Sequence, residues 1–102
     1  MNPEPQVIRH VEVRGKVQGV GFRAFVEHHA RQRGLTGWVR NRRDGSVEAL
    51  FAGSEKSVQG MIKACRVGPL GSNVDALDER GANEDDLKVR APADLFSVLA
   101  TA

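Results

Sequence analysis

The hydrophobic pattern of residues 7–33 changes from strand-like alternation to helical spacing within a few positions, and this change most limits how the chain can fold. Residues 7–17 are rich in β-branched side chains, and apolar positions alternate with charged ones, which predicts a strand with one buried face. Gly19 and Gly21 interrupt this pattern. From Phe22 the apolar side chains recur at helical spacing. A strand, a glycine-containing turn and a helix are therefore expected in direct succession.

A β-hairpin and a second helix are expected next. Residues 38–42 and 46–52 are predicted strands, and the Asp-Gly pair at 44–45 favours a tight turn between them, because glycine readily adopts positive φ. Ser54 is a favourable helix N-cap. An apolar stripe at helical spacing follows it until the Gly-Pro pair at 68–69, which ends the predicted helix.

The rest of the chain completes the expected sheet. Residues 74–77 are a short predicted strand, residues 95–99 a closing strand, residues 78–93 a polar and acidic loop, and residues 1–6 an N-terminal tail. The order βαββαβ with an extra C-terminal strand predicts an α+β fold, in which two helices pack on one face of a mostly antiparallel sheet. A length of 102 residues suits one domain spanning the whole chain, 1–102.

Composition argues against several classes of protein. The lone cysteine, Cys65, excludes an intrachain disulfide and fits a reducing cytosol. The N-terminal residues lack a signal-peptide pattern, and no apolar run approaches the ~20 residues of a membrane span. We therefore expect a cytoplasmic protein with no membrane contact. The net charge of +2 is weak support for nucleic-acid binding, although arginines gather in the first half of the chain, where an anion would be favoured.

The turn between the first strand and the first helix has the chemistry of an anion-binding site. N–H groups at a helix start lack partners within the helix, and the helix dipole adds partial positive charge. Glycines let the backbone approach a ligand closely, and successive N–H groups form a nest for phosphate oxygens. Arg23 at the helix start can add paired, charge-assisted hydrogen bonds. The predicted phosphate-binding backbone comprises Gln18, Gly19, Val20, Gly21 and Phe22.

Spacing argues against three other interpretations of this loop. Residues 19–24 match the G-x-G-x-x-A dinucleotide fingerprint, but a hairpin follows the helix instead of a parallel strand. A Walker-type loop would need Ser or Thr after Lys16, where Val17 stands. An RNA-recognition module would need stacking aromatics on a strand, whereas Phe22 and Phe25 have helical spacing. A plain structural turn stays open, but it would not explain an arginine at the start of the helix.

Two segments resemble the signatures of the acylphosphatase family. Residues 13–23 match V-x-G-x-V-Q-G-V-G-F-R without a gap, and residues 37–47 match G-x-V-x-N-x-x-D-G-x-V. The resemblance covers roughly residues 7–77. It implies a ferredoxin-like fold and hydrolysis of the carboxyl-phosphate bond of acyl phosphates. It also implies that the family's phosphate-binding arginine is Arg23 and its water-orienting asparagine is Asn41.

The residue chemistry agrees with this reaction. Asparagine can orient water but cannot take its proton as a base would. An acyl phosphate expels a carboxylate whose acid form has a pKa of about 4, so the leaving group needs little protonation. A phosphate monoester would normally need a general acid or a metal. The motifs supply no acid, because Asp44 is explained by its turn. His10, His28 and His29 are expected to be packed or solvated, and no cluster has metal-ligand spacing.

The sequence therefore predicts hydrolysis of small acyl phosphates by water, without metal, cofactor or covalent intermediate. We expect a monomer whose partner is the small-molecule substrate, with no nucleic-acid or membrane partner. The alternative is a non-catalytic module of the same fold that binds phosphate or carbamoyl phosphate, or has a regulatory role. The presence of both Arg23 and Asn41 favours the enzyme.

Overall fold

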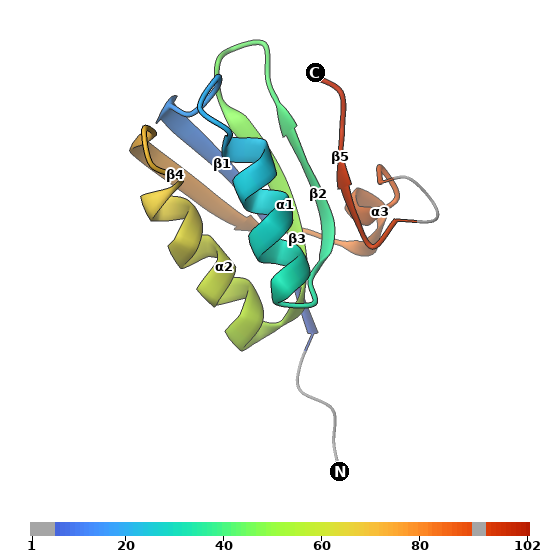
Figure 1. Ribbon diagram of the computed structural model, residues 1–102. Helices are drawn as coiled ribbons and strands as arrows, with labels where there is room; N and C mark the ends of the chain where they lie inside the picture. The colour runs from blue at the N-terminus through green and yellow to red at the C-terminus, as the bar shows by residue number, and fades with distance from the viewer. Residues whose placement is uncertain (1–5, 91–93) are drawn as a thin grey trace.

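The computed structural model describes residues 6–90 and 94–102, which form a five-stranded sheet and three helices (Figure 1). The strand order in the sheet is β4-β1-β3-β2-β5. In chain order the elements are β1 (Gln6–Lys16), α1 (Phe22–Gln32), β2 (Thr36–Asn41), β3 (Val47–Ser54), α2 (Glu55–Val67), β4 (Asn73–Gly81), α3 (Glu84–Leu87) and β5 (Phe96–Val98).

The pairing of the strands confirms the expected fold class. β1 pairs with β3 and with β4, and β2 pairs with β3, all in antiparallel orientation, whereas β2 and β5 are parallel. Figure 1 shows α1 and α2 side by side on one face of the sheet. The α+β, ferredoxin-like βαββαβ arrangement with a short C-terminal strand is therefore confirmed.

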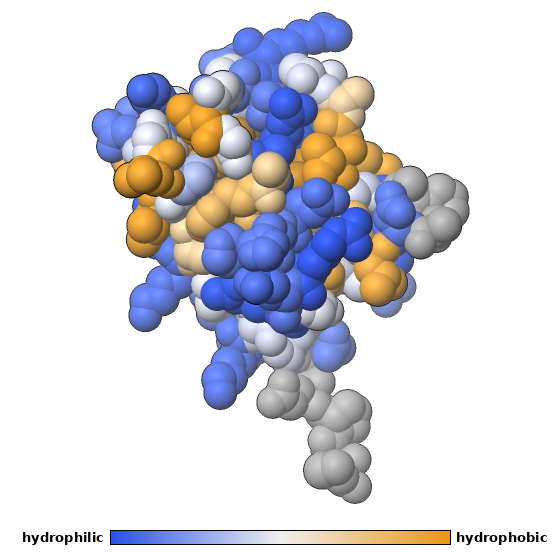
Figure 2. Space-filling view, in the orientation of Figure 1, coloured by the Kyte–Doolittle hydropathy of each residue, from blue (hydrophilic) through white to orange (hydrophobic). Residues whose placement is uncertain are grey.

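The hydrophobic core fills the space between the two long helices and the sheet. Alternate side chains of the central strands point toward the helices, and Val11 of β1 and Phe51 of β3 are fully buried there. The helices contribute Phe22, Val26 and Ala30 from α1 and Val58, Met61, Ile62 and Cys65 from α2. Figure 2 shows mostly hydrophilic side chains over the outer face of α1, as expected for an amphipathic helix. No helix in the described part of the chain is long and apolar enough to cross a membrane.

The structure corrects the expected loop over residues 78–93. β4 continues to Gly81 because it remains paired with β1 as far as the Arg9–Gly81 pair. β4 is an edge strand with mostly exposed side chains, so its second half lacks the apolar alternation that indicates a strand. The backbone partner supplied by the long β1, rather than the pattern of β4 itself, extends this strand.

A short helix, α3, replaces a second part of the same expected loop. Asn83 caps it by accepting hydrogen bonds from the N–H groups of Asp85 and Asp86, while the Asp86 carboxylate accepts from the Asn83 N–H. Residues 91–93 of the expected loop lie outside the described residues. At the other end of the chain, Gln6 was expected in a tail but begins β1, and residues 1–5 also lie outside the described residues.

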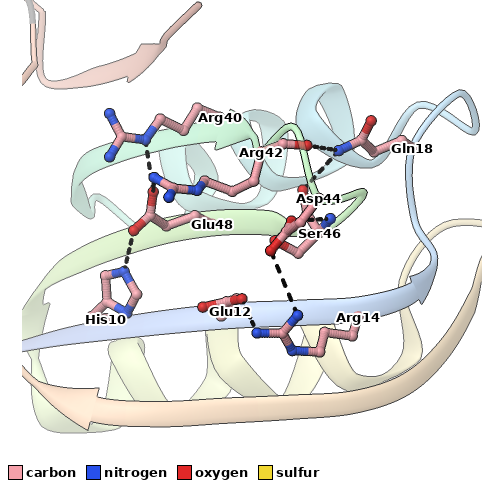
Figure 3. A network of polar contacts seen from close by, with 9 residues as sticks. All are labelled: His10, Glu12, Arg14, Gln18, Arg40, Arg42, Asp44, Ser46 and Glu48. Atoms are coloured by element: carbon pink, nitrogen blue, oxygen red, sulfur yellow. Dashed lines mark hydrogen bonds and ion pairs between the residues drawn. The ribbon is translucent and has the colours of Figure 1, made fainter. Parts of the chain in front are cut away.

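The sheet face opposite α1 and α2 carries a polar network centred on Glu48 (Figure 3). The Glu48 carboxylate lies 2.6 Å from His10 Nε2 and accepts hydrogen bonds from Arg40 at 2.7 Å and Arg42 at 3.3 Å. The Glu48 side chain is only 13% exposed. This network links β1, β3 and the C-terminal end of β2 from one side of the sheet.

The network predicts an acid-sensitive contribution to stability. Burial alone would raise the pKa of the Glu48 carboxyl, but hydrogen bonds and positive charge from His10 and Arg40 outweigh burial and hold this pKa below its usual value. A carboxyl with a lowered folded-state pKa stabilises the fold above its unfolded-state pKa, and this stabilisation is lost as pH falls through the folded-state pKa. We expect Glu48→Gln to lower the free energy of unfolding at neutral pH by about 1–3 kcal/mol.

Urea unfolding monitored between neutral pH and about pH 3 measures this effect, and Glu48→Gln should flatten the loss of stability in acid. Asp78→Asn is the matched control, because it neutralises an exposed carboxylate of β4. A Glu48→Gln protein with the stability and acid profile of the wild type would contradict the assigned role of the network.

Burial of Cys65 predicts a second measurable property. The thiol is fully enclosed on the inner side of α2, and burial raises its pKa to about 12. Because the thiolate is the reactive form, the native protein should react with a disulfide reagent only as fast as it unfolds. The unfolded protein should react stoichiometrically and at once. Rapid, complete labelling in native buffer would contradict this placement.

Candidate active site

The turn between β1 and α1 has a backbone conformation that glycine adopts readily and other residues rarely adopt. Gly19 has a φ of 73° and Gly21 a φ of 79°, both in the left-handed region. A Cβ placed on either glycine would meet no atom within 4 Å. The glycines are therefore needed for their dihedral angles and not because of crowding, and the space in front of the turn is open.

Helix α1 presents its N-terminus at this turn. Gly21 is the N-cap residue, and no side chain caps the first N–H groups. The first intrahelical hydrogen bond runs from the Phe25 N–H to the Gly21 carbonyl at 3.0 Å, so the N–H groups of Phe22, Arg23 and Ala24 have no partner within the helix. The first turn of α1 holds no acidic side chain, so no carboxylate offsets the positive end of the helix dipole.

A cavity of about 510 Å³ opens in front of this helix end and joins it to the β2–β3 hairpin. Arg23 of α1 and Asn41 at the end of β2 both line it. β3 separates β1 from β2 in the sheet, so the two residues do not meet through neighbouring strands. They meet because the loop after β1 contacts the hairpin. The wall of the cavity is formed by Val17, Gln18, Gly19, Gly21, Phe22, Arg23, Ala24, Glu27, Asn41 and Val98.

The predicted phosphate-binding residues line this cavity, with the exception of Val20. The Val20 side chain instead packs against the hydrophobic core. Phe22 is also almost fully buried, and its ring lies 5.9 Å from that of Phe25. The apolar side chains of the loop thus anchor it to the core, and its backbone is the part available to an anion.

Gln18 connects the loop to the hairpin through its side chain (Figure 3). Its amide nitrogen donates hydrogen bonds to the Arg42 carbonyl at 2.7 Å and to the Ser46 carbonyl at 2.8 Å. The turn itself is ordered by Asp44, whose carboxylate accepts from the N–H and the hydroxyl of Ser46. These Ser46 hydrogen bonds lower the pKa of the Asp44 carboxyl, with a smaller contribution from the charges of nearby arginines.

The C-terminal segment lies along the other edge of β2. Parallel pairing between β2 and β5 is followed by hydrogen bonds from the Ala102 N–H to the Asn41 carbonyl at 3.0 Å and from the Arg43 N–H to the Ala102 carbonyl at 2.8 Å. Asn41 is therefore held between β3 on one side and the C-terminal segment on the other. This placement also brings Val98 into the cavity wall.

Sequence analysis missed four residues of the wall: Val17, Ala24, Glu27 and Val98. Glu27 lies four residues after Arg23 and so on the same side of α1, a spacing that offered a usable signal. Its carboxylate lies 3.4 Å from the guanidinium of Arg31, one turn further along the helix. Val98 comes from a strand remote in sequence, and nothing in the local pattern placed it here.

The three histidines lie outside the cavity wall and are either packed against other side chains or exposed to solvent. His10 pairs with Glu48 on the opposite face of the sheet, and His28 is exposed. The His29 ring lies 4.3 Å from the Phe25 ring, and burial, followed by the charge of Arg33, lowers the pKa of His29. Within residues 6–90 and 94–102, no three His, Cys, Asp or Glu side chains are grouped so that they could hold a metal ion.

A second cavity, of about 630 Å³, lies between the sheet and the region of α3. Its wall includes Ile8, Thr36 and Leu87 together with the charged residues Lys88 and Arg90. It contains neither the glycine turn nor the end of α1. Its size alone therefore does not make it the better phosphate site.

Comparison with known proteins identifies the family of the chain. A model of the acylphosphatase family matches residues 9–90. An acylphosphatase of Rhodopseudomonas palustris (strain BisB18) is 54% identical over 95 residues, which are 93% of this chain and 96% of the relative.

Solved structures with a similar fold include an acylphosphatase and part of a larger protein. The acylphosphatase from Bacillus subtilis superimposes with a TM-score of 0.75 at 37% identity, covering 91% of this chain and 98% of that one. Full-length HypF matches with a TM-score of 0.83 at 25% identity, but the match covers 98% of this chain and only 13% of HypF. The family model and the full-length relatives together show that this chain belongs to the acylphosphatase family.

Proposed function

We propose that this protein hydrolyses the carboxyl-phosphate bond of small acyl phosphates, releasing a carboxylate and inorganic phosphate. One observation carries the proposal: a single cavity joins the open N-terminus of α1 to the side chains of Arg23 and Asn41. Membership of the acylphosphatase family, with a relative of that name 54% identical over nearly the whole chain, supports the same activity.

The phosphoryl group binds at the turn between β1 and α1. N–H groups of residues 18–22 and the start of α1 surround its oxygens, and the Arg23 guanidinium forms paired hydrogen bonds to them. Phosphoryl transfer needs mainly positioning and stabilisation of charge on these oxygens. Fixed N–H groups and one arginine supply both without a covalent step.

Asn41 orients the attacking water. Its side chain offers one acceptor and two donors, which can hold a water molecule in line with the bond that breaks. The water oxygen forms a bond to phosphorus, the phosphorus–oxygen bond to the acyl group breaks, and its electron pair leaves with the carboxylate. The proton of the water passes to an oxygen of the bound phosphate, so the substrate itself acts as the base.

The bond that is cleaved follows from the leaving group. A carboxylate leaves without protonation, whereas the alkoxide of a phosphate monoester would normally need an acid or a metal. Among the described residues, Glu27 is the one carboxyl group in the cavity wall, and it is paired with Arg31. We propose that Glu27 has no part in proton transfer.

The domain organisation, oligomeric state, location and partners of the protein are also part of the proposal. We propose a single domain spanning residues 1–102 that works as a cytoplasmic monomer without cofactor or nucleic-acid partner. Base stacking on the sheet has little support, because Phe51 faces the core with no exposed area and Trp38 is 3% exposed. A non-catalytic phosphate-binding module differs from this proposal in one respect: it would bind phosphate without turnover.

Replacement of Asn41 by alanine should separate chemistry from binding. We expect kcat for an acyl phosphate to fall by about 10²–10³-fold, because the water loses its orienting group. The inhibition constant of inorganic phosphate should change less than about 3-fold, because the N–H groups and Arg23 remain. Steady-state kinetics with phosphate as competitive inhibitor measures both. Full activity in Asn41→Ala would remove the water-orienting role.

Replacement of Arg23 by alanine should affect both binding and chemistry. We expect phosphate inhibition to weaken by at least about 10-fold and kcat to fall with it, because the guanidinium contacts the phosphoryl oxygens in both states. Glu27→Gln is the control within the same cavity and should keep kcat within about 2-fold of the wild type. A large loss of kcat in Glu27→Gln, with Arg23→Ala active, would reverse the assignment of roles.

Hydrolysis should survive removal of divalent metal. Turnover of an acyl phosphate measured with and without excess chelator should be equal, because Arg23 and the N–H groups provide the charge that a metal would otherwise supply. Activity that disappears with chelator and returns with added metal would contradict the proposed chemistry. Phosphate binding without any turnover would favour the non-catalytic module.

A further inference from the structure

The side chain of Gln18 occupies a position that phosphate binding does not explain. Phosphate binding uses the backbone of residues 18–22, yet the Gln18 amide group turns toward the hairpin (Figure 3). Both hydrogen bonds come from the amide nitrogen, which has two protons to donate. They run to the carbonyls of Arg42 and Ser46.

These two carbonyls belong to the residues next to the last β2–β3 pair, on the side of the turn. Asn41 is the last residue of β2, and it pairs with Val47, the first residue of β3. Arg42 follows Asn41 and Ser46 precedes Val47, and the Arg42 N–H also donates to the Ser46 carbonyl at 2.8 Å. A single amide therefore holds the base of the turn directly next to Asn41.

Within the described part of the chain, no strand pairing holds the loop against the hairpin, because the pairing of β1 with β3 ends before the loop begins. The pairing of β1 with β3 stops at Val13 opposite Val47, five residues before Gln18. Beyond that point an ion pair between Arg14 and Asp44, at 3.7 Å, also connects β1 to the hairpin, but it joins two side chains that are about half exposed. An exposed pair of this kind constrains geometry weakly.

We propose that the Gln18 side chain is a positioning residue that sets the distance between phosphate bound at the loop and the water held by Asn41. The inference rests on the proposed hydrolysis. The nucleophile and the phosphoryl group are held by two separate parts of the chain, the hairpin and the loop, which Gln18 joins. A displacement of about 1 Å between reacting groups can cost as much as 10²-fold in rate.

The first test compares kcat with phosphate affinity in Gln18→Met. Methionine has a similar length and no amide, so it removes both hydrogen bonds while leaving the backbone nest in place. We expect kcat to fall by about 10–100-fold, with the phosphate inhibition constant within about 3-fold of the wild type. Gln18→Asn, whose shorter side chain keeps the amide but cannot span the same distance, should show the same pattern and serves if Gln18→Met folds poorly. Arg14→Gln is the matched control and should keep kcat within about 2-fold.

The second test asks whether Gln18 acts through Asn41. In an Asn41→Ala background, where no water is oriented by that side chain, Gln18→Met should change the residual kcat by less than about 3-fold. A purely structural effect on the loop would instead reduce kcat by the same factor in both backgrounds. Thermal unfolding of every variant confirms that the assays are made on folded protein.

The outcomes distinguish this inference from the function on which it rests. A wild-type kcat in Gln18→Met, equal losses in both backgrounds, or a parallel loss of phosphate affinity would each overturn the positioning role and leave the hydrolysis standing. Wild-type protein that does not hydrolyse an acyl phosphate would overturn the proposed function and the positioning role together.

Discussion

The left-handed backbone at Gly19 and Gly21 is the constraint on which the rest of the site depends. It turns the chain from β1 into α1 within a few residues and leaves the N-terminus of α1 uncapped by any side chain. The turn requires a positive φ at both positions, which residues with a side chain rarely adopt. The same two residues thus direct the chain and leave open the space in front of the N–H groups, which the proposed phosphate site requires.

The remainder of the fold supplies stiffness around that opening. Phe22 belongs to the hydrophobic core and Val20 packs against it, so these two side chains anchor the loop. The hairpin is held from three directions: by Gln18 from the loop, by Glu48 through the Arg42 side chain, and by the C-terminal segment through Asn41. Preorganised polar groups cost little reorganisation at the moment of reaction, which is the main source of catalysis by charge stabilisation.

Sequence reasoning succeeded where local patterns carry the structure. The change of hydrophobic period at the glycine turn, the Asp-Gly pair at 44–45 and the two motif-length matches were sufficient for the fold class and for placing Arg23 and Asn41 on their elements. It failed where contacts between residues far apart in the sequence determine the structure. The end of β4 depends on pairing with β1, and the places of Val98 and the Gln18 amide depend on contacts across many residues.

The central claim is that phosphate binds at the open end of α1 and not in the larger cavity near α3. Titration of the isotopically labelled protein with inorganic phosphate, followed by the backbone amide resonances, tests it most directly. The account predicts that the largest shifts fall on the amides from Gly19 to Arg23, with smaller ones at Asn41 across the cavity. Shifts centred on Thr36, Lys88 and Arg90, with the glycine turn unperturbed, would contradict it.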